Sequence, residues 1–81
     1  MELKEELYRL GREEPEVLLN KMERAGLSEI EMKIVRLRYI ECQGFKQIDY
    51  IINYSEDGRK KAHTRACNKI IKRFKVSDFL E

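Results

Sequence analysis

Residues 27–70 read LSEIEMKIVRLRYIECQGFKQIDYIINYSEDGRKKAHTRACNKI, and they contain three amphipathic segments separated by two short turns. Gln43 and Gly44 end the first segment, and Asn53 stands where the second must turn sharply into the third. After glycine, asparagine is among the residues that best tolerate the left-handed backbone conformation that such turns use. Because the third segment is strongly basic, this layout predicts a helix-turn-helix that presents a cationic helix.

The first segment has a clear helix start. Ser28 is a good N-cap residue, and Glu31 three residues later completes a capping box. The apolar spacing predicts a helix over about 29–42. Its inner side is expected to carry Ile30, Ile34, Leu37 and, as a last candidate, Cys42.

The second and third segments each predict one more helix. The second helix is expected over about 46–53, opened by Phe45, with Ile48, Ile51 and Ile52 facing inward. The third is a long helix that begins at a cap on Ser55 or Asp57 and ends near Lys75. Its apolar stripe consists of Ala66, Ile70 and Phe74, flanked by Ala62, Cys67 and Ile71.

Two shorter helices are expected before this stretch. The first covers about 2–10 with Gly11 at its end, and the second has Pro15 in its first turn and Gly26 as its stop. They either cap the domain or form the seam of a homodimer, through the faces Leu3-Leu7-Leu10 and Val17-Leu18-Met22-Ala25. The whole chain is therefore expected to be all-α, with about five helices.

Size and composition suit one small globular domain. The chain has 81 residues, of which 42% are apolar and 40% charged, which is too apolar for a disordered tail and too charged for a membrane protein. We divide it into a helical extension (1–26), the helix-turn-helix (27–75) and a short tail (76–81), in which Phe79 and Leu80 are candidates for packing on the core. With no secretory signal, the expected location is the cytoplasm, without a membrane partner.

The residues that could carry catalysis or bind metal are few. Cys42 and Cys67 lack a CxxC spacing, and His63 is the only histidine, whereas a zinc site needs about four ligands. We expect no metal, no cofactor and no enzymatic activity, and we expect both cysteines to be small reduced core residues, although a disulfide between them stays open. His63 faces the apolar stripe, so we expect it to be half-buried and hydrogen-bonded.

Charge is unevenly distributed along the chain. Residues 1–31 carry nine acidic and five basic side chains, whereas residues 55–75 carry eight bases against two acids. A basic segment on one end of a small protein suggests a nucleic-acid-binding face. A solvated lysine-rich helix would give the same pattern, so charge alone leaves the two interpretations equal.

One ordered set of residues runs through most of this region. It comprises Leu27-Ser28, Glu31, Ile34-Val35-x-Leu37-Arg38-Tyr39, Gly44, Ile48, Ile52-Asn53-x-Ser55 and Arg65-Ala66. This order resembles the C-terminal domain of bacterial sigma factors, which reads the −35 promoter element, and the small sigma-like regulators of phages and mobile elements. The resemblance covers Leu27 to about Phe74, a little over half of the chain.

The resemblance implies a role for each helix of the pair. Phe45 to Asn53 would be the positioning helix, and Ser55 to about Phe74 the recognition helix in the major groove of duplex DNA. Phosphate contacts would come from Lys46 and Gln47, with Tyr54 as a further candidate. Lys60, Lys61 and Thr64 are the best candidates for base edges. On the same outward face lie Asp57, Arg65 and Asn68, and phosphate contacts or solvation are expected for Arg65, Lys69, Lys72 and Arg73.

Two positions depart from the family pattern. Asp49 stands where the family usually has a small residue, and Arg59 stands where it usually has an apolar one. In the family fold these positions face each other across the two helices, so we expect an Asp49–Arg59 ion pair that is partly buried. The alternative is that Asp57 and Gly58 shift the helix start and Arg59 points to solvent.

Three functions compete at this stage. The favoured one is a sequence-specific DNA-binding transcriptional regulator, in which Glu56 and Asp57 compensate the helix dipole or accept from cytosine amino groups. The second is a protein-interaction module that binds host RNA polymerase without specific DNA binding. An enzyme is the least favoured. The tyrosines that remain are expected in the core or at its rim: Tyr39, Tyr50 and Tyr54.

Overall fold

The computed structural model describes residues 3–73, and this part of the chain is all-α, as expected. It contains no strand. Five α-helices occur, and the third continues directly into a π-helical segment, η1. In chain order the elements are α1 (Leu3–Glu13), α2 (Pro15–Arg24), α3 (Glu29–Val35), η1 (Arg36–Ile40), α4 (Phe45–Ile52) and α5 (Glu56–Arg73).

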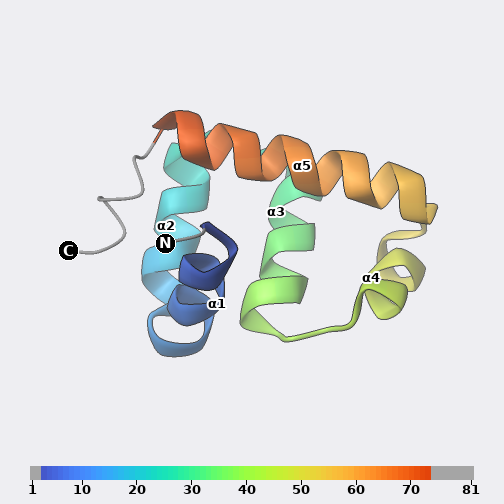
Figure 1. Cartoon of the computed structure of the whole chain (residues 1–81), viewed down its shortest axis with the longest axis horizontal. Helices are drawn as coiled ribbons and strands as arrows, with labels where there is room; N and C mark the ends of the chain where they lie inside the picture. Colours follow the sequence, from blue (N-terminus) through green and yellow to red (C-terminus); the bar gives the residue numbers. More distant parts are fainter. Residues whose placement is uncertain (1–2, 74–81) are drawn as a thin grey trace.

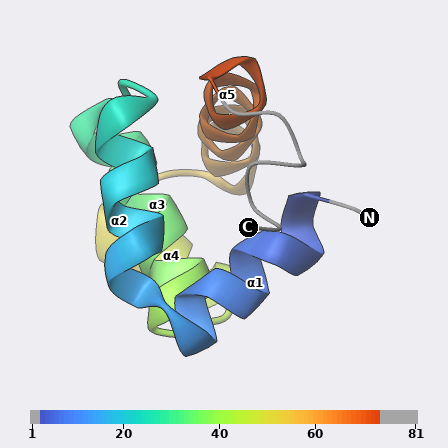
Figure 2. The ribbon, with the colours of Figure 1, turned by 90° about the vertical axis from the view of Figure 1, so that its left-hand side faces the viewer.

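The long helix α5 crosses the other helices and contacts α2, α3 and α4 (Figure 1). The pair α1 and α2 lies beneath the C-terminal half of α5, α3 stands in the middle, and α4 lies beneath its N-terminal end. Figure 2 looks nearly along α5, with α1 and α2 toward the viewer. The extension and α4 are therefore at opposite ends of α5. Within residues 3–73, no helix combines the length and the apolar character needed to cross a membrane.

The start of α3 has the expected capping box. The Glu31 backbone N–H donates to Ser28 Oγ at 3.3 Å, and the Ser28 backbone N–H donates to Glu31 Oε1 at 2.8 Å. These two bonds satisfy N–H groups that a helix start otherwise leaves without partners. The N-terminal limit of this helix was thus correctly predicted.

The end of the same helix differs from the prediction. Instead of one α-helix to residue 42, the chain forms a π turn in which the Glu41 N–H donates to the Arg36 carbonyl at 3.0 Å. Cys42 then adopts a left-handed backbone with φ of 57° and is exposed. Our assignment of Cys42 to the inner side was wrong, because the wider π turn changes the direction in which the following residues point.

We expected Gly11 to end α1, but this residue lies buried inside the helix. The helix runs on to Glu13. A Cβ atom on Gly11 would overlap the backbone carbonyl of Tyr39, so this glycine lets α1 approach the η1 backbone directly. The glycine is thus a packing requirement rather than a stop signal.

The core consists of two adjoining clusters of buried side chains. The larger joins α1 and α2 to α3, η1 and α5, through Leu7, Leu10, Leu18, Met22, Leu27, Val35, Tyr39, Ala66 and Ile70. The smaller lies inside the helix-turn-helix and comprises Ile34, Leu37, Ile48, Ile52 and Ala62. Most of the two faces that we considered as a dimer seam is therefore covered within one chain, whereas Val17 stays exposed.

Several apolar residues expected inside are exposed. Ile51 and Tyr50 on α4 are 43% and 85% exposed, and Val17 and Ile71 also lie at the surface. Val17, Ile51 and Ile71 stand at the edges of their helical stripes, whereas Tyr50 lies on the side of α4 opposite to Ile48 and Ile52. Phe74, Phe79, Leu80 and the end of the last helix lie outside the described residues.

Candidate nucleic-acid interface

The turn between α4 and α5 has the predicted geometry. Asn53 adopts the left-handed conformation, with φ of 57° and ψ of 45°. After it, Ser55 caps α5, because its Oγ accepts a hydrogen bond of 3.1 Å from the backbone N–H of Gly58. These two residues fix the angle at which α5 leaves α4.

Three of the expected base-reading residues lie together on the outer face of α5. Lys60, Lys61 and Thr64 are exposed, and with Arg65 they line a shallow hollow on this helix. Asn68 is exposed one turn further along α5. The inner face carries the buried stripe of Arg59, Ala62, His63, Ala66 and Ile70.

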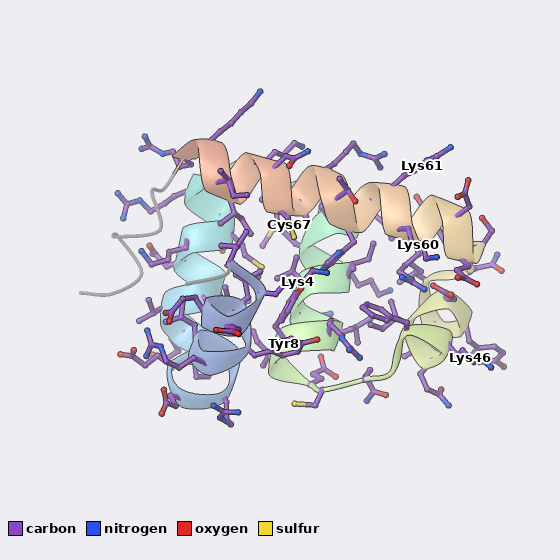
Figure 3. All side chains as sticks on the ribbon, viewed as in Figure 1. Lys4, Tyr8, Lys46, Lys60, Lys61 and Cys67 are labelled. Atoms are coloured by element: carbon purple, nitrogen blue, oxygen red, sulfur yellow. The ribbon has the colours of Figure 1, made fainter. Side chains whose placement is uncertain are left out.

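Lys46 and Gln47 are both exposed in the first turn of α4. Figure 3 places Lys46 at the same end of the molecule as Lys60 and Lys61. The N-cap of α4 is Gly44, which offers no side chain to the first backbone N–H groups. A helix start of this kind favours an anion such as a DNA phosphate.

Both outer lysines are paired with the acids that precede them on α5. Lys60 Nζ lies 2.9 Å from Glu56 Oε1, and Lys61 Nζ lies 3.4 Å from Asp57 Oδ2. The hydrogen bond from Lys60 holds the pKa of the Glu56 carboxyl below its usual value. Pairs this exposed contribute little stability, so a stronger ligand can displace them.

Glu31 is the central buried carboxylate of the domain. Its side chain is only 2% exposed, and it receives Lys69 Nζ at 2.7 Å and Arg65 Nε at 3.4 Å in addition to its capping bond. Burial acts to raise the pKa of this carboxyl, but hydrogen bonds from Lys69 and Ser28 outweigh it and lower the pKa. Arg65 and Lys69 therefore brace α5 against α3, a role that we did not anticipate.

The charges at Asp49 and Arg59 meet between α4 and α5. Arg59 Nε donates to Asp49 Oδ1 at 2.8 Å, and its Nη2 reaches Oδ2 at 3.5 Å. Arg59 is buried, and its guanidinium carbon lies 4.2 Å from the centre of the Phe45 ring. The alternative in which Arg59 points to solvent is wrong.

A second arginine links α4 to the N-terminal extension. Arg38 Nε donates to the Tyr8 hydroxyl at 2.9 Å, and its Nη1 donates to the Gln43 carbonyl at 3.0 Å. Its guanidinium carbon also lies 3.9 Å from the centre of the Phe45 ring. This side chain thus joins α1, η1 and the start of α4.

His63 is buried and hydrogen-bonded, in line with our expectation. Its Nε2 lies 2.7 Å from the Tyr39 hydroxyl and 3.9 Å from Cys67 Sγ. Burial lowers the pKa of the His63 ring, and the positive charges of Lys4, Arg59 and Arg38 lower it further. Burial also raises the pKa of Tyr39, so a neutral phenol and a neutral ring share this hydrogen bond near pH 7.

The remaining candidates for chemistry are separate from one another. Cys42 and Cys67 are both free thiols, and burial raises the pKa of the Cys67 thiol. Among residues 3–73, no group of three histidine, cysteine or acidic side chains is arranged to hold a metal ion.

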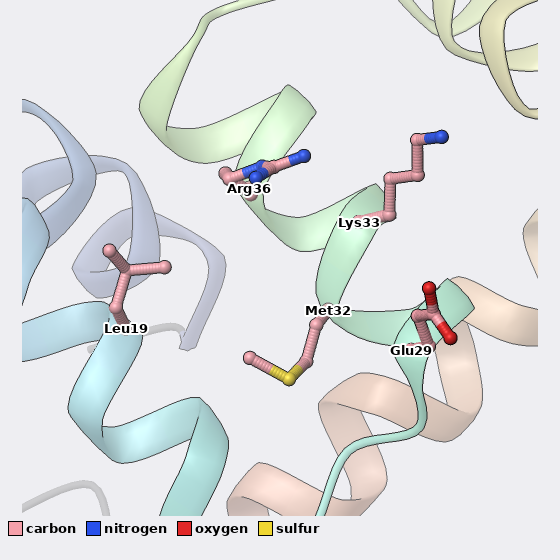
Figure 4. A pocket seen from close by; sticks show the side chains of 5 residues that line it. All are labelled: Leu19, Glu29, Met32, Lys33 and Arg36. Carbon is pink, nitrogen blue, oxygen red and sulfur yellow. The ribbon is translucent and has the colours of Figure 1, made fainter.

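An open pocket of about 330 Å³ lies between α2 and the α3–η1 unit (Figure 4). Its lining residues are Leu19, Glu29, Met32, Lys33 and Arg36. None of these residues belongs to α4 or α5, so the pocket is distinct from the candidate interface. Its side chains carry both signs of charge, and they do not select one class of ligand.

Comparisons of the chain with models of known families, with curated proteins and with solved structures gave no match. The geometry and charge of the α4–α5 unit are therefore the features that indicate a function.

Proposed function

We propose that this protein is a sequence-specific DNA-binding transcriptional regulator of the sigma-like helix-turn-helix type. The observation that carries the proposal is the outer face of α5, on which Lys60, Lys61 and Thr64 project together. A rigid, cationic helix surface of this kind fits the major groove, whose width admits one α-helix.

In this proposal the two helices have different tasks. Lys60 and Lys61 donate to guanine acceptors, and the Thr64 methyl group meets a thymine methyl. Lys46 and Gln47 contact phosphate at the start of α4, supported by its backbone N–H groups. Asn68 extends the base-reading face, while Ser55 sets the start of α5 through its cap on Gly58.

The acidic partners of the two lysines suit selective rather than general DNA binding. Glu56 and Asp57 must release Lys60 and Lys61 before these side chains bind DNA. The same carboxylates repel phosphate, which weakens binding to any duplex that offers no compensating base contacts. We therefore expect weak binding to random duplex DNA and tighter binding to a specific site.

Selection from a random duplex pool tests the proposal and identifies the site. We expect an enriched sequence motif and tighter binding to a duplex with this motif than to a scrambled duplex. The affinity should fall steeply as the salt concentration rises. Replacing both Lys60 and Lys61 with alanine should remove the preference for the motif. Lys60→Ala and Lys61→Ala are also measured singly, with Arg12→Ala as their matched control, because it removes one exposed positive charge from α1, at the other end of the molecule. Absence of duplex binding at low salt would reject the proposal.

A second candidate is a protein-interaction module that binds RNA polymerase. The observation that favours it is that Lys60 and Lys61 are already paired with Glu56 and Asp57, so the outer face of α5 has mixed charge. A pull-down of purified bacterial RNA polymerase, combined with absent DNA binding at low salt, would select this function instead.

A further inference from the structure

The outer face of α4 carries an unusually exposed tyrosine. Tyr50 is 85% exposed, and Tyr54, in the turn that follows, is 40% exposed. A phenol side chain combines a rigid apolar ring with a hydroxyl group, and it loses little conformational freedom when it binds a partner. An exposed tyrosine beside a candidate interface is therefore well suited to contact a ligand.

The position of Tyr50 follows from the helix period. At about 100° per residue, Tyr50 lies about 40° around α4 from Lys46 and one turn further along the helix. Tyr54 lies in the turn after α4, beside the first turn of α5, where its ring atom Cδ2 would be 3.5 Å from a Cβ atom on Gly58. We call these three residues, Lys46, Tyr50 and Tyr54, the α4 edge. It comprises the first two turns of α4 and the turn that leads into α5.

We propose that the Tyr50 and Tyr54 hydroxyl groups donate hydrogen bonds to DNA phosphates beside the groove that α5 enters. This inference rests on the proposed function and assigns two positioning residues to it. In helix-turn-helix proteins the first helix crosses the DNA backbone, and hydroxyl groups are common donors to phosphate. Lys46 supplies the positive charge on the same edge.

The alternative occupant of this surface is a protein. A protein interface on α4 would include Ile51, which is 43% exposed and adjoins Tyr50 in sequence. At about 100° from Tyr50 around the helix, however, Ile51 lies on the flank away from Lys46. The α4 edge itself consists of a cation and two hydroxyl donors, which matches a phosphate backbone better than an apolar partner.

Five variants separate these possibilities: Tyr50→Phe, Tyr50→Ala, Tyr54→Phe, Lys46→Ala and Ile51→Ala. Binding to the selected duplex and to a scrambled duplex is measured over a range of salt concentrations. We expect Tyr50→Phe to weaken binding to both duplexes by the same factor, roughly fivefold, because one hydrogen bond to phosphate is lost. The dependence on salt should not change, since the phenol is uncharged. Tyr54→Phe should behave in the same way.

The comparison with Lys46 makes this test specific. Lys46→Ala should weaken binding and also reduce the slope of log affinity against log salt by about 0.9, which is the signature of one lost phosphate contact. Ile51→Ala should leave both duplex affinities unchanged. Thermal unfolding of each variant shows whether the fold is retained, and the high exposure of Tyr50 predicts an unchanged melting temperature for its variants.

Two results would overturn the inference. The first is wild-type affinity for both duplexes in Tyr50→Phe and Tyr50→Ala, while the wild-type protein itself binds the selected site. The second is loss of RNA polymerase binding in both Tyr50→Ala and Ile51→Ala with DNA affinity intact, which would assign the surface to a protein. If the wild-type protein binds no duplex at low salt, the proposed function fails as well.

Discussion

Lys69 Nζ lies 2.7 Å from Glu31 Oε1, and this contact ties the middle of α5 to the first turn of α3. The same carboxylate caps α3 through the Ser28 N–H and also receives Arg65. One buried acid therefore fixes the helix start and the orientation of the helix that would read DNA. Its loss should affect both the stability of the fold and the proposed function.

Replacing Glu31 by Gln should lower the free energy of unfolding by about 1–3 kcal/mol, because a buried, charge-assisted set of hydrogen bonds is weakened. Urea unfolding followed by circular dichroism measures the change. Glu29→Gln is the matched control, since Glu29 is exposed two positions earlier. An equal loss in both variants would show that Glu31 has no special role.

The Glu31 contacts also predict a dependence of stability on pH. The pKa of this carboxyl is lowered in the folded protein from an ordinary value of 4.5. The folded state therefore binds its proton less readily than the unfolded chain, and the stabilisation is present above pH 4.5 and lost as pH falls through the folded pKa. The unfolding free energy of Glu31→Gln should lack this part of the acid dependence.

The Asp49–Arg59 pair can be tested by a double-mutant cycle. Because both side chains lie between α4 and α5, each single change to alanine leaves a poorly solvated charge without its partner. We expect each to cost about 1–3 kcal/mol of unfolding free energy and the coupling energy to be about 1–2 kcal/mol. A coupling energy near zero would mean that Asp49 and Arg59 contribute independently to the free energy of unfolding, with no stabilisation from the ion pair itself.

Gly11→Ala should destabilise the protein, although alanine is normally the better helix former by about 1 kcal/mol. The reversal of sign is expected because the added methyl group would overlap the Tyr39 carbonyl, so α1 must move away from η1. We expect a loss of about 2 kcal/mol or more, typical of overpacking. Gly44→Ala is the control for the added methyl group, since open space surrounds that position, and only a small loss is expected there because alanine is a poorer N-cap residue than glycine. A higher melting temperature for Gly11→Ala than for the wild-type protein would contradict this packing.

Local signals in the sequence were enough to place the helices that build the candidate interface. The Ser28 and Glu31 capping box, Asn53 in the left-handed turn and the alternation of apolar and charged positions each act within a few residues. Such signals can be recognised in the sequence because the residues that determine the local structure lie within a few positions of the residues that adopt it.

The features that sequence reasoning missed depend on contacts between distant segments. The Glu31–Lys69 pair and the Gly11 contact with Tyr39 join residues that only the tertiary fold brings together. The π turn at η1 has no local sequence signature of comparable strength. The helical period itself places Tyr50 on the side of α4 opposite to the buried Ile48 and Ile52, so its exposure follows from the sequence, and assigning it to the core or rim gave too little weight to that period.

His63 should titrate below its ordinary pKa of 6.5, since burial and the charges of Lys4, Arg59 and Arg38 all oppose protonation. Figure 3 shows Lys4 and Cys67 beneath α5, where this ring also lies. The unfolded chain then binds the proton more readily than the folded protein. The contribution of neutral His63 to the free energy of unfolding should be fully present above pH 6.5, and it should decrease as the pH drops from 6.5 toward the pKa of the folded state.

Because His63 is the only histidine, its ring signals can be followed without ambiguity by proton NMR between pH 4 and 8. The stability profile can be measured in parallel by urea unfolding, where one proton contributes a slope of at most about 1.4 kcal/mol per pH unit. Tyr39→Phe should cost about 1 kcal/mol, because it removes the hydroxyl that bonds Nε2. A midpoint at or above 6.5 would show that the ring is solvated rather than enclosed between η1 and α5.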